Sequence, residues 1–271
     1  MDSDSGLFGP DSVTWRLHAD PAYAVGTFSG LLLQALHPQA VAAVDQNGGF
    51  RDDWWGRLNR TGDYLFVTTF GTEREALRAG ARVRGIHRKL RATDPYTGET
   101  FRVDRPDLLL WVHNSVTDTV LWVAERAGLD LSRQDQDRYV REQLKAAELV
   151  GLTPDLVPDN RADLAEYMHD IRTVLALTEP ARAGIWTLAN PPMAGWVKLL
   201  TPARAGWASL AGLAVGLLPA WARQMYGMPG LPLTDVAATA GLRALRTTAR
   251  ALPDRWRDNP AVRAARARVA A

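Results

Sequence analysis

The sequence predicts an all-α protein with a single compact, bundle-like helical domain. Apolar residues recur at helical spacing along most of the 271-residue chain. Helix-capping sequences, such as the capping box Thr72-Glu73-Arg74-Glu75, precede several of these stretches. Runs that alternate apolar and polar residues are almost missing, so we expect one short hairpin between two core helices and no larger sheet.

The composition excludes several classes of protein. Lys and Arg number 32 against 30 for Asp and Glu, so the near-neutral balance gives no electrostatic case for nucleic acid. Cysteine is absent, which excludes disulfides, thiolate-ligated haem, cysteine-based zinc sites and cysteine nucleophiles. The acidic start, residues 1–6, lacks the apolar region of a secretory signal, so we expect a cytoplasmic protein.

The first third of the chain is expected to be helical, with proline and glycine breaks. Helices are expected over residues 12–19, 22–44, 54–70 and 72–91. Pro38 removes an amide donor and disfavours helix at the preceding residue, so the second helix should break at His37. The capping box that begins at Thr72 marks the start of the fourth helix.

The rest of the chain continues this pattern after a single hairpin over residues 94–103, with its turn at Thr97-Gly98. Asp104 is expected to cap the following helix, which ends at Gly128. Later helices are expected over residues 134–150, 161–177, 203–226 and 234–252, with short helices between residues 180 and 202.

No repeat or linker forces a domain boundary. We expect a helical domain over residues 1–232, followed by a C-terminal helix and Arg-rich tail over residues 233–271. Such a tail is most often solvated, with nucleic acid or an anionic membrane surface as the less common alternative. Residues 205–222 are free of charge but diluted by glycine and proline, so we favour a buried helix there and keep weak membrane contact as the alternative.

One histidine lies on the apolar face of the helix expected over residues 104–128. The residues that share its stripe are Leu109, Leu110, Val116, Thr117 and Val120. This spacing turns His113 towards the core, where an imidazole needs a partner. A backbone carbonyl, a carboxylate and a metal ion are the candidates, and a core histidine bonded to a neighbour is the commonest outcome.

Three histidines, His37, His87 and His113, are expected on inward faces of different helices, which converge in a bundle core. If they meet, zinc bound by three histidines or iron bound by two histidines and a carboxylate is possible. No HExxH or HxH pattern supports either site. A haem fits better, because one axial imidazole suffices and flanking arginines can hold its propionates. The chain also lacks a phosphate loop, a GxSxG elbow and a paired-carboxylate motif.

Five short motifs, in order, resemble the latex-clearing protein and MpaB-type oxygenase family. They are Leu33-Gln34-Ala35-Leu36-His37-Pro38, Arg57-Leu58-Asn59-Arg60-Thr61, Phe70-Gly71, Arg84-Gly85-Ile86-His87 and Asp107-Leu108-Leu109-Leu110-Trp111-Val112-His113. A later stretch, Leu218-Pro219 with Arg223, Tyr226 and Gly227, is also similar. The resemblance covers roughly residues 12 to 230.

The resemblance implies an all-α fold around haem b, in which His113 is the proximal iron ligand. It implies that the helix carrying Arg84 forms the distal side. We therefore expect His113, Arg84, Arg60 and His37 to bind the cofactor. Latex-clearing proteins have a lysine three residues after this arginine. Here the residue is His87, which puts rubber cleavage in doubt and allows His87 to be a second axial ligand or a hydrogen-bond donor to dioxygen.

The function expected from these observations is that of a haem b-dependent oxygenase or dehydrogenase. His87 and Arg84 would be the catalytic residues, and Asp118 or Asn114 could orient the iron ligand. The substrate would be a small apolar or natural-product-like molecule, with cleavage or oxidation of a carbon–carbon double bond among the open reactions. Dioxygen and an electron donor, which the sequence does not identify, would be partners. The alternatives are a non-catalytic haem sensor or carrier and a helical protein of the membrane surface.

Overall fold

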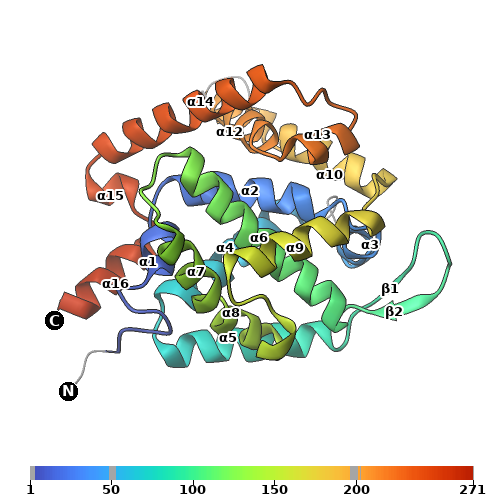
Figure 1. The fold of residues 1–271 in the computed structure, drawn as a ribbon, viewed down its shortest axis with the longest axis horizontal. Helices are drawn as coiled ribbons and strands as arrows, with labels where there is room; N and C mark the ends of the chain where they lie inside the picture. The colour runs from blue at the N-terminus through green and yellow to red at the C-terminus, as the bar shows by residue number, and fades with distance from the viewer. Residues whose placement is uncertain (1–3, 49–52, 196–200, 202, 271) are drawn as a thin grey trace.

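The computed structural model describes residues 4–48, 53–195, 201 and 203–270, and this part of the chain is almost entirely helical (Figure 1). The prediction of an all-α fold is confirmed. The only sheet among the described residues is an antiparallel pair that projects from one end of the molecule, in which Ala92 is opposite Phe101.

The elements follow each other along the chain as short and medium helices. The first half contains α1 (Val13–His18), α2 (Ala22–Gln34), α3 (Pro38–Gln46), α4 (Trp54–Phe70), α5 (Glu73–His87), β1 (Arg91–Thr93), β2 (Thr100–Arg102) and α6 (Pro106–Arg126). The second half contains α7 (Arg133–Glu142), α8 (Leu144–Val150), η1 (Pro154–Leu156), α9 (Arg161–Asp170), η2 (Ile171–Val174), α10 (Glu179–Ala189), α12 (Ala203–Gly216), α13 (Ala220–Met225), α14 (Pro232–Ala251), α15 (Asp254–Arg257) and α16 (Pro260–Ala270).

Local capping signals fix several helix ends as predicted. Ser12 caps α1 by accepting a hydrogen bond from the Trp15 amide. The Thr72–Glu75 capping box begins α5, with both of its reciprocal bonds present. The break at His37 is confirmed, and Pro38 is the first residue of α3. Gly151, with φ of 101°, ends α8 in the left-handed conformation that glycine adopts at no steric cost.

Two predicted ends around the hairpin are wrong. Helix α5 ends at His87 rather than near Arg91, because the residues from Arg91 onward pair as strand β1. Asp104 does not cap α6. Its carboxylate instead accepts a hydrogen bond of 2.8 Å from Nε of Arg102, and Arg105 takes the cap position without a side-chain bond.

Three long helices predicted in the second half are interrupted. The segment 134–150 divides into α7 and α8 at Gln143, whose side chain donates to Oγ1 of Thr14, 2.9 Å away. The segment 161–177 ends in the 3₁₀ turn η2, and the segment 203–226 divides into α12 and α13 before Pro219. Tertiary contacts and proline geometry outweigh helix propensity at these points.

Helix α6 crosses the middle of the molecule and packs along α2 (Figure 1). The indole of Trp111, which is fully buried, donates to the carbonyl of Gln34, and the Gln34 amide donates back to the carbonyl of Val112. Gly30 of α2 lies at this contact, where an added Cβ would be 3.6 Å from the Val116 side chain, an ordinary van der Waals distance. These contacts fix the rotation of α6, and therefore the direction of each of its faces.

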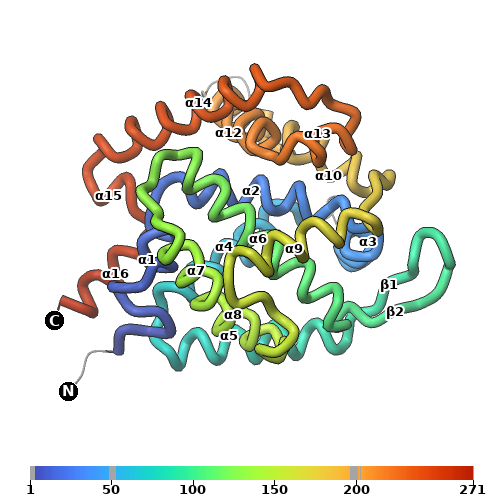
Figure 2. The backbone as a smooth tube through the Cα atoms, in the orientation of Figure 1, coloured from blue at the N-terminus to red at the C-terminus, as the bar shows by residue number. Residues whose placement is uncertain are grey.

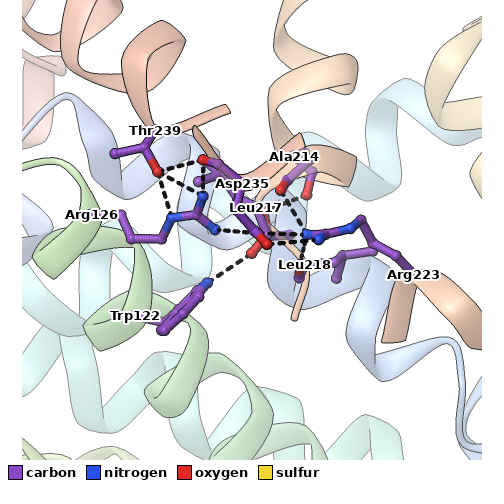
Figure 3. A network of polar contacts seen from close by, with 10 residues as sticks. Trp122, Arg126, Ala214, Leu217, Leu218, Arg223, Asp235 and Thr239 are labelled. Carbon is purple, nitrogen blue, oxygen red and sulfur yellow. Dashed lines mark hydrogen bonds and ion pairs between the residues drawn. The ribbon is translucent and has the colours of Figure 1, made fainter. Parts of the chain in front are cut away.

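Helices α12, α13 and α14 form a layer along one edge of the molecule, above α2 and α6 in the view of Figure 1. Arginine and aspartate side chains join this layer to α6 (Figure 3). Arg223, 1% exposed, bonds Asp235 at 3.0 Å, and Arg126 of α6 donates to the same carboxylate at 3.3 Å. The residues after 232 therefore pack on the rest of the protein.

The two described ends of the chain lie on the same side of the molecule (Figure 2). Helix α16 packs against α4, and Arg268 donates to the carbonyls of Asp4 and Phe70 at 2.7 and 2.8 Å. Among the helices that the structure describes, none combines the length and the apolar character needed to cross a membrane.

Candidate functional site

His113 faces the interior from the middle of α6, as its stripe predicts. Thr117 and Val120 of that stripe are buried, while the imidazole itself is half-buried. Burial lowers the pKa of His113 to about 4, so the ring is neutral at pH 7. Its nitrogen atoms form no hydrogen bond or ion pair with any residue in the described part of the chain. The half-buried imidazole therefore keeps a lone pair that no residue in the described part of the chain uses.

His87 is the last residue of α5 and is also half-buried. Its Nδ1 is buried and has no hydrogen-bond partner among the described residues. Burial lowers the pKa of His87, the charge of Arg57 lowers it further, and the Asp104 carboxylate opposes both effects. A neutral imidazole can donate from one nitrogen and accept at the other, so His87 has capacity for a ligand that the chain does not use.

Helix α4 presents a half-buried polar stripe formed by Arg57, Thr61 and Tyr64, at i, i+4 and i+7. Burial raises the pKa of Tyr64 to about 12, although the charge of Arg84 acts in the opposite direction. Burial also lowers the pKa of Arg57, and the like charge of Arg60 adds to this effect. Because α4 packs on α5, these groups belong to the same region as His87.

Arg84 has a second role in the structure besides the expected one. Its Nη1 donates to the carbonyl of Leu149 at the end of α8, at 2.7 Å, and its aliphatic part lies against Gly151. One turn earlier, Gly80 allows the helices to approach closely, because an added Cβ would lie 2.8 Å from the same carbonyl oxygen. Arg84 therefore holds α5 on α8 while its charge acts on Tyr64.

Two other residues expected at the cofactor have local partners. The Arg60 side chain is 64% exposed and pairs with Asp53 at 2.8 Å. His37 caps α3 by accepting from the Ala40 amide at 3.4 Å, and its ring centroid lies 6.1 Å from that of Trp111. The structure gives both residues a part in organising their own helices.

The alternatives that needed three protein ligands are not supported. Within the described ranges, no three His, Asp or Glu side chains come together to hold a metal ion, so His37, His87 and His113 do not form a zinc site. Asp118 pairs with Arg161 of α9 at 2.7 Å, and burial raises the pKa of this carboxyl. Asn114 is buried and its Nδ2 has no partner among the described residues.

Reasoning from the sequence did not select Arg57 and Tyr64. Both lie in or near the motif that contains Arg60, but the side of α4 that faces inward was not worked out from the spacing. The buried Trp54 and Thr68 continue the stripe of Arg57 and Tyr64 at helical intervals, whereas Arg60 lies off it. This periodicity was the signal that could have chosen Arg57 over Arg60.

Fold and site together define an all-α protein with a half-buried, neutral histidine that has no hydrogen-bond partner among the described residues. The family model of the ER-bound oxygenase mpaB/B' and rubber oxygenase catalytic domain matches residues 15–251. The chain belongs to this family and carries an oxygenase-type catalytic domain. Neither a search of curated proteins nor a search of solved structures found a match.

Proposed function

We propose that this protein is a haem b-dependent oxygenase whose iron is bound by His113. The observation that carries the proposal is the neutral imidazole of His113, which lies in the interior without a carbonyl or carboxylate partner in the described structure. The imidazole is half-buried and its nitrogen atoms are not fully enclosed, so a ligand can reach them. An unprotonated imidazole is the form that ligates iron.

The candidate site residues fit a haem better than a bare metal ion. No three His, Asp or Glu side chains come together as metal ligands in the described part of the chain, whereas a haem iron would need only one imidazole from the protein. The propionates of haem require cations, and Arg57 of α4 and Arg84 of α5, beside His87 and Tyr64, would provide them. When bound, haem would supply the activation of dioxygen.

The chain's own groups would position dioxygen and substrate. His87 keeps a neutral imidazole whose buried Nδ1 has no partner among the described residues, and it would either donate a hydrogen bond to dioxygen or bind the iron as a second ligand. Few waters compete for that bond in a region of low dielectric, so the bond is strengthened. Arg84 contributes a positive charge near Tyr64.

The family supports dioxygen and an organic substrate as partners. We infer a small apolar or natural-product-like substrate that could undergo oxidation or cleavage at a double bond, with an electron donor that is a separate partner. The placement of the substrate, rather than the cofactor, would choose among these reactions.

The test is the absorption spectrum of the purified protein, together with its iron and haem content. We expect a Soret band and roughly equal amounts of haem, iron and protein, since one axial histidine holds one haem. The His113→Ala variant should lose haem, whereas the His169→Ala variant, changed at an exposed position on α9, should retain it. A colourless protein that cannot be reconstituted with haem would overturn the proposal and favour a structural or membrane-surface role.

A haem sensor or carrier would give the same spectrum without turnover. Dioxygen uptake in the presence of a reductant and candidate substrates separates the two functions. Uptake that depends on substrate and disappears in His113→Ala supports the oxygenase.

A further inference from the structure

Helix α5 carries a row of exposed cations on the side turned away from the candidate site. Arg74, Arg78 and Arg82 follow each other at i, i+4 and i+8, so they share one face of the helix, and all three are exposed. Arg88 and Lys89, also exposed, extend the row beyond the end of the helix. These residues are named the α5 cation row. Helix α5 itself lies along the lower edge of the molecule in the view of Figure 1.

The α5 cation row has little negative charge beside it. Residues 76–93 contain no Asp or Glu, so the helix offers the row no carboxylate after its first turn. In the part of the chain that the structure describes, the cations after Arg74 form no hydrogen bond or ion pair through their side chains. At the start of the helix, Glu75 closes the capping box and the Asp4 carboxylate accepts a hydrogen bond from the Glu73 amide.

The Arg-rich tail, where the sequence allowed an anionic partner, differs from this row. Three of its arginines pair with aspartates, namely Arg246 with Asp20 at 2.9 Å, Arg257 with Asp254 at 2.6 Å, and Arg266 with Asp258. Like charges at i and i+4 destabilise a helix, so the α5 cation row does not contribute to the stability of α5. Its positive field favours a negatively charged partner from outside the chain.

We propose that the α5 cation row is the docking surface for a small acidic protein that donates electrons to this enzyme. The inference rests on the proposed function, in which the electron donor is a separate partner. The opposite side of α5 carries Arg84 and His87 of the candidate site. A protein docked on the row therefore lies about 10 Å, one helix diameter, from that site. Each encounter oxidises the donor by one electron and reduces the oxygenase by one.

The dimensions of the row fit a transient protein partner. From Arg74 to Lys89 the row is about 22 Å long, since an α-helix rises about 1.5 Å per residue. A hollow of about 490 Å³ adjoins its first two arginines and is lined in part by Leu77 and Ala81. A small, charged contact area with an apolar centre suits the weak complexes that electron-transfer proteins form.

An anionic membrane and a nucleic acid are less suited to this surface. A helix that binds at a membrane surface inserts an apolar face, whereas the small apolar residues Ala76 and Gly80 of α5 are buried inside the protein. Residues 73–91 contain no Phe, Tyr or Trp on which bases could stack, and the net charge of the chain is only +2. Both ligands are tested below as alternatives.

The first experiment measures binding of a plant-type [2Fe–2S] ferredoxin, a small acidic one-electron donor, to the full-length protein by calorimetry. We expect binding that weakens about tenfold or more as salt rises from about 50 to 500 mM, because salt screens the charges. At low salt, the double variant Arg78→Glu/Arg82→Glu should bind about tenfold or more weakly than wild type. Wild-type protein that does not bind ferredoxin, or binds it independently of salt, overturns the proposal.

The matched control is the double variant Arg182→Glu/Arg250→Glu, which changes the net charge by the same amount. Both arginines are exposed and form no ion pair in the described structure, and they lie on α10 and α14, away from α5 in Figure 1. Thermal unfolding shows whether each variant is folded. The control should bind ferredoxin within about twofold of wild type. Equal losses in the two folded double variants would reduce the effect to net charge and refute the docking surface.

Vesicles of phosphatidylserine and a single-stranded oligonucleotide are measured with the same variants. The proposal predicts that neither ligand distinguishes Arg78→Glu/Arg82→Glu from the control. If either ligand, and not ferredoxin, binds in a way that depends on Arg78 and Arg82, the acidic protein partner is wrong.

Reduction of the haem-loaded protein separates this inference from the proposed function. Reduced ferredoxin should change the Soret band of wild type about tenfold or more faster than that of Arg78→Glu/Arg82→Glu, whereas dithionite should act on both at the same rate. Equal rates with ferredoxin would overturn the docking of a donor even though haem binds. If the protein binds no haem but its affinity for ferredoxin depends on Arg78 and Arg82, the haem oxygenase fails and the docking surface stands.

Discussion

Two interior histidines of this protein, His18 and His113, have opposite surroundings. His18 lies between α1, α4 and α7, with Nδ1 2.9 Å from Oγ1 of Thr69 and Nε2 3.1 Å from the hydroxyl of Tyr139. Its ring also stacks on Tyr23, with centroids 4.2 Å apart. His113 has none of these partners in the described structure. Burial nevertheless lowers the pKa of His18 to about 3 and that of His113 to about 4.

The comparison shows that burial and neutrality do not mark a ligand site by themselves. Both rings are desolvated and both are neutral at pH 7, but only His18 has used both of its nitrogen atoms within the chain. The unused lone pair of His113 is the distinguishing property. Experiments that compare variants at the two histidines therefore test whether His113, and not His18, binds a ligand from outside the chain.

The largest effect is expected for haem affinity. His113→Gly should weaken haem binding by about 100-fold or more, because the only axial ligand from α6 is removed. Free imidazole added to this variant should restore the Soret band by occupying the vacated position. His18→Gly, measured with and without imidazole, is the control. The folded fraction of this variant should bind haem as wild type does. Equal haem loss in folded His18→Gly would contradict the distinction.

The next effect is on the free energy of unfolding, and here the substitution at His18 should have a larger effect than the substitution at His113. His18→Phe should lower the free energy of unfolding by about 2–4 kcal/mol, because Thr69 and Tyr139 lose their buried partner. His113→Ala should lower that of the haem-free protein by about 1 kcal/mol or less, since no hydrogen bond is broken. Denaturant titrations measure both values. A larger loss for His113→Ala than for His18→Phe would indicate a structural role for His113.

A smaller effect, of about 1.4 kcal/mol per pH unit for each histidine, is expected in the pH dependence of stability. Both folded-state pKa values lie below the ordinary value of 6.5, so the unfolded chain binds protons that the folded chain does not. The contribution is fully present above pH 6.5 and is lost as the pH falls towards about 4 for His113 and about 3 for His18.

Unfolding of the haem-free protein at pH 7, 6 and 5 tests this dependence. His18→Phe and His113→Ala should each give a shallower decline than wild type. Added haem should make the loss of unfolding free energy with falling pH smaller only in proteins that keep His113, because an iron-bound imidazole resists protonation. Identical slopes in all variants would contradict the pKa assignments.

The smallest effect is expected for His87→Ala. If His87 donates a hydrogen bond to dioxygen, the variant should retain haem within about threefold of wild-type affinity and change its spectrum with added ligands, since a neutral hydrogen bond contributes only about 1 kcal/mol. His169→Ala is again the control. A loss of haem as severe as that in the His113 variants would instead identify His87 as a second axial ligand.

The sequence predicted those parts of the fold that depend on local chemistry. The capping box at Thr72, the proline after His37 and the glycine at 151 act within a few residues, and the structure confirms all three. The wrong ends depend on competition between partners, one of them two residues away and one distant in the chain. Asp104 was available as a cap until Arg102 of the hairpin bound it, and Gln143 interrupts a helix where it reaches Thr14, far away in the chain.

The same distinction applies to the site. The inward direction of His113 followed from the stripe on α6, and the structure confirms it. That His113 has no partner among the described residues could not be predicted, because any helix packed on α6 can provide a carbonyl or a carboxylate. The contrast between Arg57 and Arg60 likewise depends on Asp53, whose carboxylate pairs with Arg60 at 2.8 Å and not with Arg57, the nearer of the two arginines in the chain.

The contact between Gly80 and the carbonyl of Leu149 limits where residues can be inserted into this protein or deleted from it. That contact leaves no room for a methyl group, so residue 80 must remain glycine where α5 meets α8. Its position sets the directions in which the later side chains of α5 point. His87 lies about two helical turns further on and thus on the same face. One inserted residue between them would rotate the imidazole by about 100°, away from Arg57 and Tyr64. Deletions and insertions should therefore be far more damaging in these seven residues than in the hairpin that follows, where added residues can extend into solvent.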